Sequence, residues 1–203
     1  MSHLPDCLTF DAFDLPPAFV ARCEAAAVGS SDTERAVGLY FFVRDAVRYN
    51  PFVIEFDDWP MRPHRVWERK QGHCVDKAML YVLAARRLGM ESRLGLARVR
   101  NHAGTARLEQ MLGTDVLVPH GYAAVFLDQK WIKCTPAFNR ELCIKLNVEP
   151  LDWDGRSDSL LQESDKQNRT YMEYLEDYGL FDHVPVSFML QKMADEYPGF
   201  RLF

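Results

Sequence analysis

Cys74 is the residue of this sequence whose surroundings most clearly suit chemistry. It follows Gly72-His73 and precedes an apolar run from Met79 to Leu88 that Gly89 closes, so the pattern predicts a helix that begins at Cys74. The unpaired N–H groups of a first helical turn, and the positive end of the helix dipole, favour a thiolate over a thiol. We therefore expect Cys74 to be a nucleophile.

A cysteine nucleophile needs a base, and histidine is the side chain that titrates near neutral pH. His120 opens an apolar, β-rich run that ends at Leu127, and a turn-like Asp128-Gln129-Lys130 joins it to a second run from Trp131 to Thr135. This pattern predicts a β-hairpin. A strand that begins with His120 and lies beside the helix of Cys74 would complete a Cys–His pair.

Together these motifs resemble the transglutaminase-like superfamily of papain-type thiol enzymes, in particular its small bacterial members. Val66 to Cys74 resembles the family's Leu-x-x-Lys/Arg-x-Gly-x-Cys pattern, and His120-Gly121-Tyr122, Trp131 and Thr135-Pro136-Ala137 resemble its His-Ala-Trp, Trp and Asp-Pro-Thr. The similarity covers roughly residues 30 to 140. It implies an α+β, papain-like transglutaminase core, in which a helix cluster with the catalytic cysteine at a helix N-terminus packs on an antiparallel β-sheet that carries the histidine.

The third member of a catalytic triad is where the sequence departs from the family. Thr135 stands where the family has the aspartate that holds the catalytic imidazole. A hydroxyl can orient the ring but cannot supply the charge that stabilises an imidazolium. Asn139, four residues later, is the alternative, because papain-type sites can use an amide for this purpose. The sequence leaves both residues open.

Three further residues are candidates for contact with a substrate. The backbone N–H of Cys74 can serve an oxyanion, and Gln71 or Trp59 can supply a second donor. His73 adjoins the nucleophile and is expected in the wall of the cleft. No pair of cysteines or histidines has the spacing of a zinc site, and no glycine-rich phosphate loop follows a strand. We therefore expect neither a metal nor a cofactor.

Composition limits the class of protein. At 203 residues, with 48% hydrophobic and 26% charged residues, the chain suits one globular domain over 1–203, with a core at about 30–140 and a C-terminal extension at about 141–203 packed on it. The net charge of −5 argues against a nucleic-acid partner. The N-terminus does not resemble a signal peptide, and no apolar run is long enough to span a bilayer. With five widely spaced cysteines, these features predict a soluble, cytoplasmic protein with reduced thiols and no membrane partner.

Further elements follow from periodicity and caps. Helices are expected from Pro17 to about Ala27, after a Ser31-x-x-Glu34 capping box to Val47, and at 139–146 and 186–197, with a strand at 91–100. Residues 48–64, 101–113 and 152–170 are expected to be loops or exposed connections, apart from a short strand at 159–161. Substrate identity is expected to lie in loops 50–64 and 101–118.

Two functions from different classes fit these observations. The first is an enzyme in which Cys74 attacks an amide or related acyl group of a peptide, protein or small amide, His120 moves the proton, and water releases the product. The second is a catalytically degenerate member whose cleft binds a peptide or a protein. Thr135 in place of an acid, and Tyr122-Ala123-Ala124 where the family carries a tryptophan and an acidic residue, favour the second. Of acyl hydrolysis and acyl transfer, we expect hydrolysis.

Overall fold

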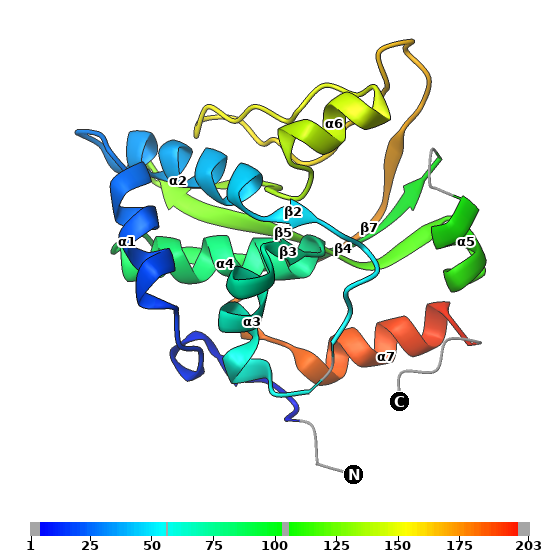
Figure 1. Cartoon of the computed structure of the whole chain (residues 1–203), viewed down its shortest axis with the longest axis horizontal. Coiled ribbons are helices and arrows are strands. Elements are labelled where there is room, and N and C mark those ends of the chain that lie inside the picture. The colour runs from blue at the N-terminus through cyan, green and yellow to red at the C-terminus, as the bar shows by residue number, and fades with distance from the viewer. Residues whose placement is uncertain (1–4, 56, 103–105, 199–203) are drawn as a thin grey trace.

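The computed structural model describes residues 5–55, 57–102 and 106–198 (Figure 1). Its helices are α1 (Pro17–Ala26), α2 (Asp32–Ala46), α3 (Arg62–Arg69), α4 (Cys74–Arg87), α5 (Ala106–Leu112), α6 (Arg140–Leu146) and α7 (Val186–Glu196), with 3-10 turns η1 (Phe10–Ala12) and η2 (Trp59–Met61). Its strands are β1 (Leu8–Thr9), β2 (Arg48–Tyr49), β3 (Gln71–Gly72), β4 (Ser92–Asn101), β5 (Val116–Leu127), β6 (Lys130–Cys134), β7 (Met172–Phe181) and β8 (His183–Val184).

The main sheet has four antiparallel strands in the order β6-β5-β4-β7. Helix α4 packs against β5, and α2 packs against α4, so the helices and the sheet form adjacent layers (Figure 1). Two small sheets tie distant segments together, because β1 pairs with β8 and β2 pairs in parallel with β3. The structure is thus α+β, with an antiparallel sheet beside a helix that begins at Cys74.

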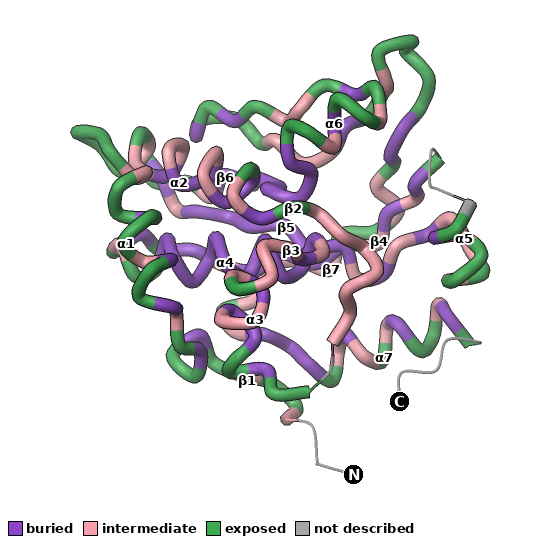
Figure 2. The backbone as a smooth tube through the Cα atoms, viewed as in Figure 1, coloured by how far each residue is buried: buried purple, intermediate pink, exposed green. Residues whose placement is uncertain are grey.

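Helix α4 is the centre of the core. Every residue from Cys74 to Ala85 is buried, as the purple tube in Figure 2 shows, whereas much of α1 and α6 is exposed. An apolar surface all around a helix is stable only where neighbours cover each face, and α2, α3 and β5 do so here. His73 caps the helix, and its backbone N–H donates to the carboxylate of Asp76 at 3.1 Å.

The first turn of α4 is held in place from the end of α2. β2 follows α2, and β3 immediately precedes His73, so the β2–β3 pair joins the two helix ends. Lys77 adds a second tie, because its buried ammonium donates to the carbonyl of Arg44 at 2.7 Å and to that of Val47. These carbonyls end α2 and have no partners within it. The position of Cys74 is therefore set by two independent connections.

Most elements that the sequence predicts are present. The helices at α1, α2, α4, α6 and α7, the strand β4 and the β5–β6 hairpin confirm the predictions, and the Ser31 capping box is formed. The predicted loops at 48–64 and 101–113 are wrong in part, because α3 begins at Arg62 and α5 occupies Ala106–Leu112. Strand β7 has no counterpart in the predictions. Its faces are mostly half-buried or exposed, so its sequence lacks clear apolar alternation.

Within the described ranges, each helix lacks the length and apolar character that a membrane span requires.

Candidate active site

Cys74 is the first residue of α4 and lies against β5. Its side chain is 7% exposed, and Sγ donates a weak hydrogen bond to the carbonyl of Pro119 at 3.9 Å. Gly121 lies so close to α4 that a Cβ there would come within 2.6 Å of the Val75 Cα. Only glycine permits this approach. The backbone on both sides of His120 thus contacts the start of the helix that carries the thiol.

The His120 side chain is buried in β5, where His120 pairs with Ala97 of β4. Neither ring nitrogen has a hydrogen-bond partner in the described part of the chain, so the imidazole and the Cys74 thiol are not hydrogen-bonded in this structure. The ring lies edge-on to Tyr174 of β7, with 6.5 Å between the ring centres. The structure therefore brings the histidine strand to the thiol but leaves the imidazole unpaired.

Burial controls the protonation of Cys74. Desolvation raises the pKa of the thiol to about 11, although the N–H groups of Gly121 and Val75 partly oppose it. The expectation that the helix N-terminus favours the thiolate is therefore wrong for the free protein. A buried thiolate loses more hydration than the helix dipole and these N–H groups return.

His120 is shifted in the opposite direction by the same cause. Burial lowers its pKa to about 4, because an imidazolium at this position would lose its hydration and find no hydrogen-bond acceptor among the described residues. At neutral pH the free site thus holds an uncharged thiol beside a strand that carries an uncharged imidazole. The imidazole is in the form that can accept a proton, and the thiol is in the form that must give one up.

The two candidates for the third member of the triad are in different situations. The Thr135 hydroxyl is buried and has no partner among the described residues. Thr135 follows Cys134, which pairs with Ala123, so the register continued by one residue sets it opposite Tyr122. The Asn139 side chain instead accepts the backbone N–H of Tyr49 at 3.0 Å and thereby anchors β2. Of the two, Thr135 has the free polar group.

Asp177 is a carboxylate that sequence reasoning missed. It pairs with Ala97, which in turn pairs with His120, so the three residues form one row across β7, β4 and β5. Its carboxylate accepts hydrogen bonds from the Tyr122 hydroxyl at 2.6 Å and from the Lys133 ammonium at 2.7 Å. These partners occupy both oxygens, so Asp177 makes no contact with the imidazole here.

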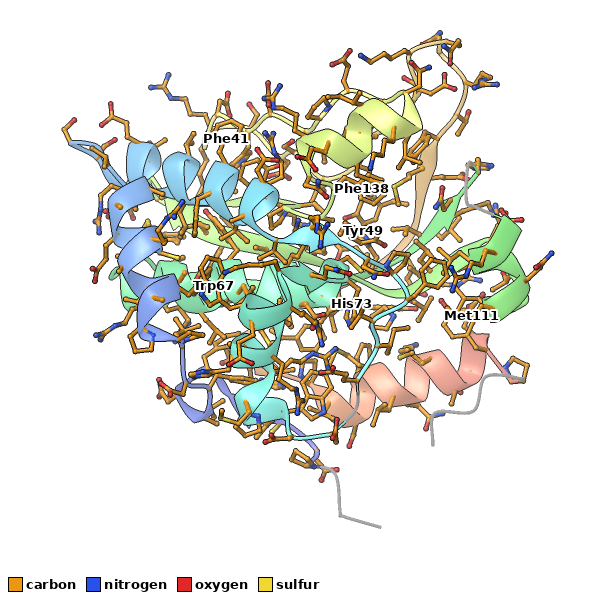
Figure 3. All side chains as sticks on the ribbon, in the orientation of Figure 1. Phe41, Tyr49, Trp67, His73, Met111 and Phe138 are labelled. Atoms are coloured by element: carbon orange, nitrogen blue, oxygen red, sulfur yellow. The ribbon has the colours of Figure 1, made fainter. Side chains whose placement is uncertain are left out.

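A cleft opens onto Cys74. The empty space within and in front of it is about 690 Å³, which includes open solvent. The 49–55 segment, η2, α5, the start of β5 and α7 supply most of its walls, and Figure 3 labels Tyr49, His73 and Met111 among its residues. The lining residues are Tyr49, Pro51, Ile54, Glu55, Trp59, Arg62, His73, Cys74, Val75, Met111, Leu112, Leu117, Val118, Pro119, Met189, Leu190, Met193 and Tyr197.

Two of the three residues predicted to contact a substrate line the cleft in the structure, and the third does not. Trp59 lines the cleft, and its buried indole N–H has no acceptor among the described residues. His73 also lines the cleft. Gln71 does not, and its side-chain oxygen accepts from the amide of Asn50 at 2.8 Å. The available N–H therefore belongs to Trp59, and Gln71 supports the loop instead.

A network of buried charges underlies the other side of the first turn. Asp76, which is fully buried, pairs with Arg62 and with Arg69 at 3.5 Å. The Arg62 guanidinium also lies 2.8 Å from Nε2 of His73, whose Nδ1 accepts the backbone N–H of Val75. Burial, with Arg62 and Arg69 nearby, lowers the pKa of His73 to about 4. His73 is thus an uncharged cap.

The part of the cleft that sequence reasoning missed comes from α5 and α7. The apolar stripe of α7 predicts a docking helix, but a stripe does not reveal what it covers. In the structure Met189, Leu190 and Met193 line the cleft, and the Tyr197 hydroxyl accepts the backbone N–H of Val118 at 2.7 Å and so fixes the end of α7 to β5.

In the described ranges, no group of three or more histidine, cysteine, aspartate or glutamate residues is placed to hold a metal ion.

The fold and the site together define a class: an α+β protein with a cysteine at the start of a buried helix and a histidine on the adjacent antiparallel sheet. The sequence model of the Transglutaminase-like superfamily matches residues 21–136, and the chain belongs to this family. Its fold is the papain-like transglutaminase core. No curated protein matches the chain in sequence.

Two solved structures are similar in part. One, a TGase, has 20% sequence identity and a TM-score of 0.37, and the match covers 56% of this chain and 28% of the other. The second is a "Putative Cysteine Protease" from Cytophaga hutchinsonii with 10% identity and a TM-score of 0.42, covering 81% and 49% of the two chains. This chain therefore spans about half or less of the length of these proteins.

Proposed function

We propose that this protein is a cysteine hydrolase that cleaves an amide or a related acyl bond of a peptide, protein or small amide. Cys74 is the nucleophile, His120 the base, and the Thr135 hydroxyl orients the imidazole. The observation that carries the proposal is a thiol at a helix N-terminus that lines a cleft and contacts the backbone on both sides of a buried histidine. Family membership supports thiol-dependent chemistry in general.

The reaction is a two-step acyl transfer. As Cys74 Sγ forms a bond to the carbonyl carbon, the thiol proton passes to His120 and then to the leaving amine, so that the C–N bond breaks and a thioester remains. Water then attacks the thioester and gives one proton to His120, which acts as the base. The hydroxyl of the water stays on the acyl carbon, the C–S bond breaks, and His120 returns the proton to sulfur. The Cys74 backbone N–H and the Trp59 indole N–H donate to the oxyanion.

The protonation states favour concerted proton transfer over a preformed ion pair. A thiol with a pKa of about 11 does not transfer its proton to an imidazole with a pKa of about 4 at rest. Proton transfer becomes favourable only as sulfur bonds to carbon, because sulfur then no longer holds a negative charge. This requires the His120 ring to reach the thiol when a substrate is bound.

The test is turnover of a set of peptide amides and activated esters by the purified chain. We expect Cys74→Ala to lose activity by at least about a thousandfold and His120→Gln by about a hundredfold or more. Cys7→Ser is the matched control, because Cys7 is exposed and lies outside the cleft. Products formed with and without an added amine separate hydrolysis from transfer. Equal turnover in the wild type and in Cys74→Ala would refute the proposal.

A second function is favoured by the same protonation states. A protonated thiol and an imidazole without a partner also suit a member that binds a peptide in the cleft and does no chemistry. In that case no substrate is turned over, and a peptide binds the wild type and Cys74→Ala equally well. Calorimetric binding measurements on both proteins distinguish this outcome from the enzyme.

A further inference from the structure

We infer that the cleft accepts an acyl donor whose side chain next to the attacked carbonyl is apolar and uncharged, and that α7 is a main determinant of this preference. The inference rests on the proposed function, because it assigns the substrate class of the same thiol. It goes beyond the family core, because α7 begins fifty residues after the matched segment, which ends at residue 136.

The walls of the cleft are apolar on the sides formed by α7, α5 and β5. Met189, Leu190 and Met193 come from α7, and Leu112 and Met111, which Figure 3 labels, come from α5. The start of β5 adds Leu117, Val118 and Pro119. Burying an apolar side chain against such walls is favourable, whereas a charged or amide side chain would lose its hydration without regaining hydrogen bonds.

The charged residues in the lining are already paired with one another or with neighbours. The Glu55 carboxylate pairs with Arg69 at 2.5 Å and with Arg65 at 3.0 Å. The Arg62 guanidinium pairs with Asp76 and donates to the Glu55 carbonyl at 2.5 Å. A charged substrate group would have to break one of these pairs. Among the described lining residues, no charged group is therefore free to pair with a charged side chain, and the proposed mechanism assigns the free indole N–H of Trp59 to the oxyanion.

The α7 wall is fixed to the sheet at its C-terminal end. The Tyr197 hydroxyl accepts from Val118 and donates to the carbonyl of Val116 at 2.9 Å, and Glu196 forms a two-bond ion pair with Arg98. Methionine side chains in a fixed wall adapt to apolar groups of different shapes. We therefore expect the cleft to select for apolar character more strongly than for one particular shape.

The experiment measures alkylation of Cys74 by N-acetyl amino-acid chloromethyl ketones that share one reactive group and differ in side chain. Each reaction forms a C–S bond, breaks the C–Cl bond and releases chloride and the thiol proton. Mass spectrometry of the proteolytic peptide that contains Cys74 gives its rate separately from that of the exposed Cys7. We expect the leucine and phenylalanine probes to react about tenfold or more faster than the glutamine, glutamate and lysine probes. A hexyl chloromethyl ketone tests whether an aliphatic chain suffices without a peptide bond.

Two variants link the preference to the wall. Leu190→Asp and Met111→Asp change partly exposed lining positions on α7 and α5, and Ile144→Asp is the control, because Ile144 is 68% exposed on α6. We expect the first two to reduce the leucine-over-glutamate ratio to about threefold or less, with Leu190→Asp having the larger effect, and Ile144→Asp to keep the wild-type ratio. Iodoacetamide, which has no side chain, should alkylate Cys74 at similar rates in all four proteins if they are folded.

The outcomes separate this inference from the proposed function. Equal rates for all side chains, or a faster glutamine probe, would overturn the inference even if peptide amides are hydrolysed. A clear apolar preference without any turnover would support the inference about the cleft and refute the enzyme. A ratio that persists in Leu190→Asp but disappears in Met111→Asp would assign the selectivity to α5 and refute the role of α7.

Discussion

Two buried regions of the molecule differ in how their polar groups are paired. At the first turn of α4, Asp76, Arg62 and His73 form a network in which each charged group has partners. On β5 and just after β6, the His120 ring nitrogens and the Thr135 hydroxyl have no hydrogen-bond partners among the described residues.

This difference distinguishes polar groups that stabilise the fold from polar groups that are candidates for catalysis. Buried polar groups in native proteins are nearly always paired, so pairing needs no functional explanation, whereas unpaired groups do. The Arg62 and Asp76 pair stabilises the helix start that holds the thiol. The unpaired groups of His120 and Thr135 are buried and do not line the cleft, so their use in catalysis requires a rearrangement that brings them to the thiol. The four predictions below test this distinction, from the largest expected effect to the smallest.

Disrupting the network of Asp76, Arg62 and His73 should lower the free energy of unfolding more than any other change. Asp76→Asn leaves the buried Arg62 charge without its partner, and we expect the free energy of unfolding to fall by about 3–5 kcal/mol in urea titrations. Asp57→Asn is the matched control, because Asp57 is 80% exposed and lies 3.8 Å from Arg65. It should change stability by less than about 0.5 kcal/mol. A similar small effect for Asp76→Asn would show that the network is not structural.

The buried, unpaired imidazole of His120 should make the stability of the fold depend on pH below neutrality. The pKa of His120 is lowered from 6.5 to about 4, so between these values the unfolded chain binds a proton that the folded chain does not. Stability should therefore be unaffected above pH 6.5 and fall as the pH decreases towards 4, by up to about 3 kcal/mol for this group. His73 adds a similar loss, because its pKa is also about 4.

His120→Gln removes one of these two contributions. Urea titrations at pH 7 and at pH 4.5 should show a smaller acid-induced loss in His120→Gln than in the wild type. His183→Gln is the control, because that ring is partly exposed and its Nδ1 lies 2.7 Å from the Asp182 carboxylate. If the free energy of unfolding falls by the same amount between pH 7 and pH 4.5 in His120→Gln and in the wild type, the His120 imidazole is not held in a buried, uncharged form.

The thiol should react slowly with a small reagent. A pKa raised from 9.0 to about 11 reduces the thiolate fraction at pH 7.5 about a hundredfold, and Cys74 should react with iodoacetamide correspondingly more slowly than an ordinary thiol. The exposed Cys7 is the internal reference. The rate for Cys74 should still be rising above pH 9. Fast alkylation at pH 6 that is lost in His120→Gln would instead indicate a thiolate–imidazolium pair.

The smallest effect is expected at the third position. Thr135→Val removes a hydroxyl without a partner, so stability should change by less than about 0.5 kcal/mol, while turnover should fall about tenfold if the hydroxyl orients His120. Asn139→Ala should instead lower stability by about 1–2 kcal/mol, because the Tyr49 N–H loses its acceptor. Loss of turnover in Asn139→Ala but not in Thr135→Val would assign the role to the amide.

Local sequence was sufficient for elements whose signals are local. The helix from Cys74, the Ser31 capping box and the hairpin after His120 were predictable, because periodicity, caps and turn residues act within a few residues. Strand β7 was not predictable in this way. It pairs with β4 some seventy to ninety residues away, and its half-exposed faces leave no clear alternation.

The sequence by itself determined the family, the helix that begins at Cys74 and the strand that contains His120, because these depend on residue types at short spacing. Tertiary structure decided the rest: that α5 and α7 form walls of the cleft, that Asn139 anchors β2, and that burial raises the pKa of the thiol against the helix dipole. The physical reason is that desolvation depends on what covers a group, and segments distant in sequence provide that cover.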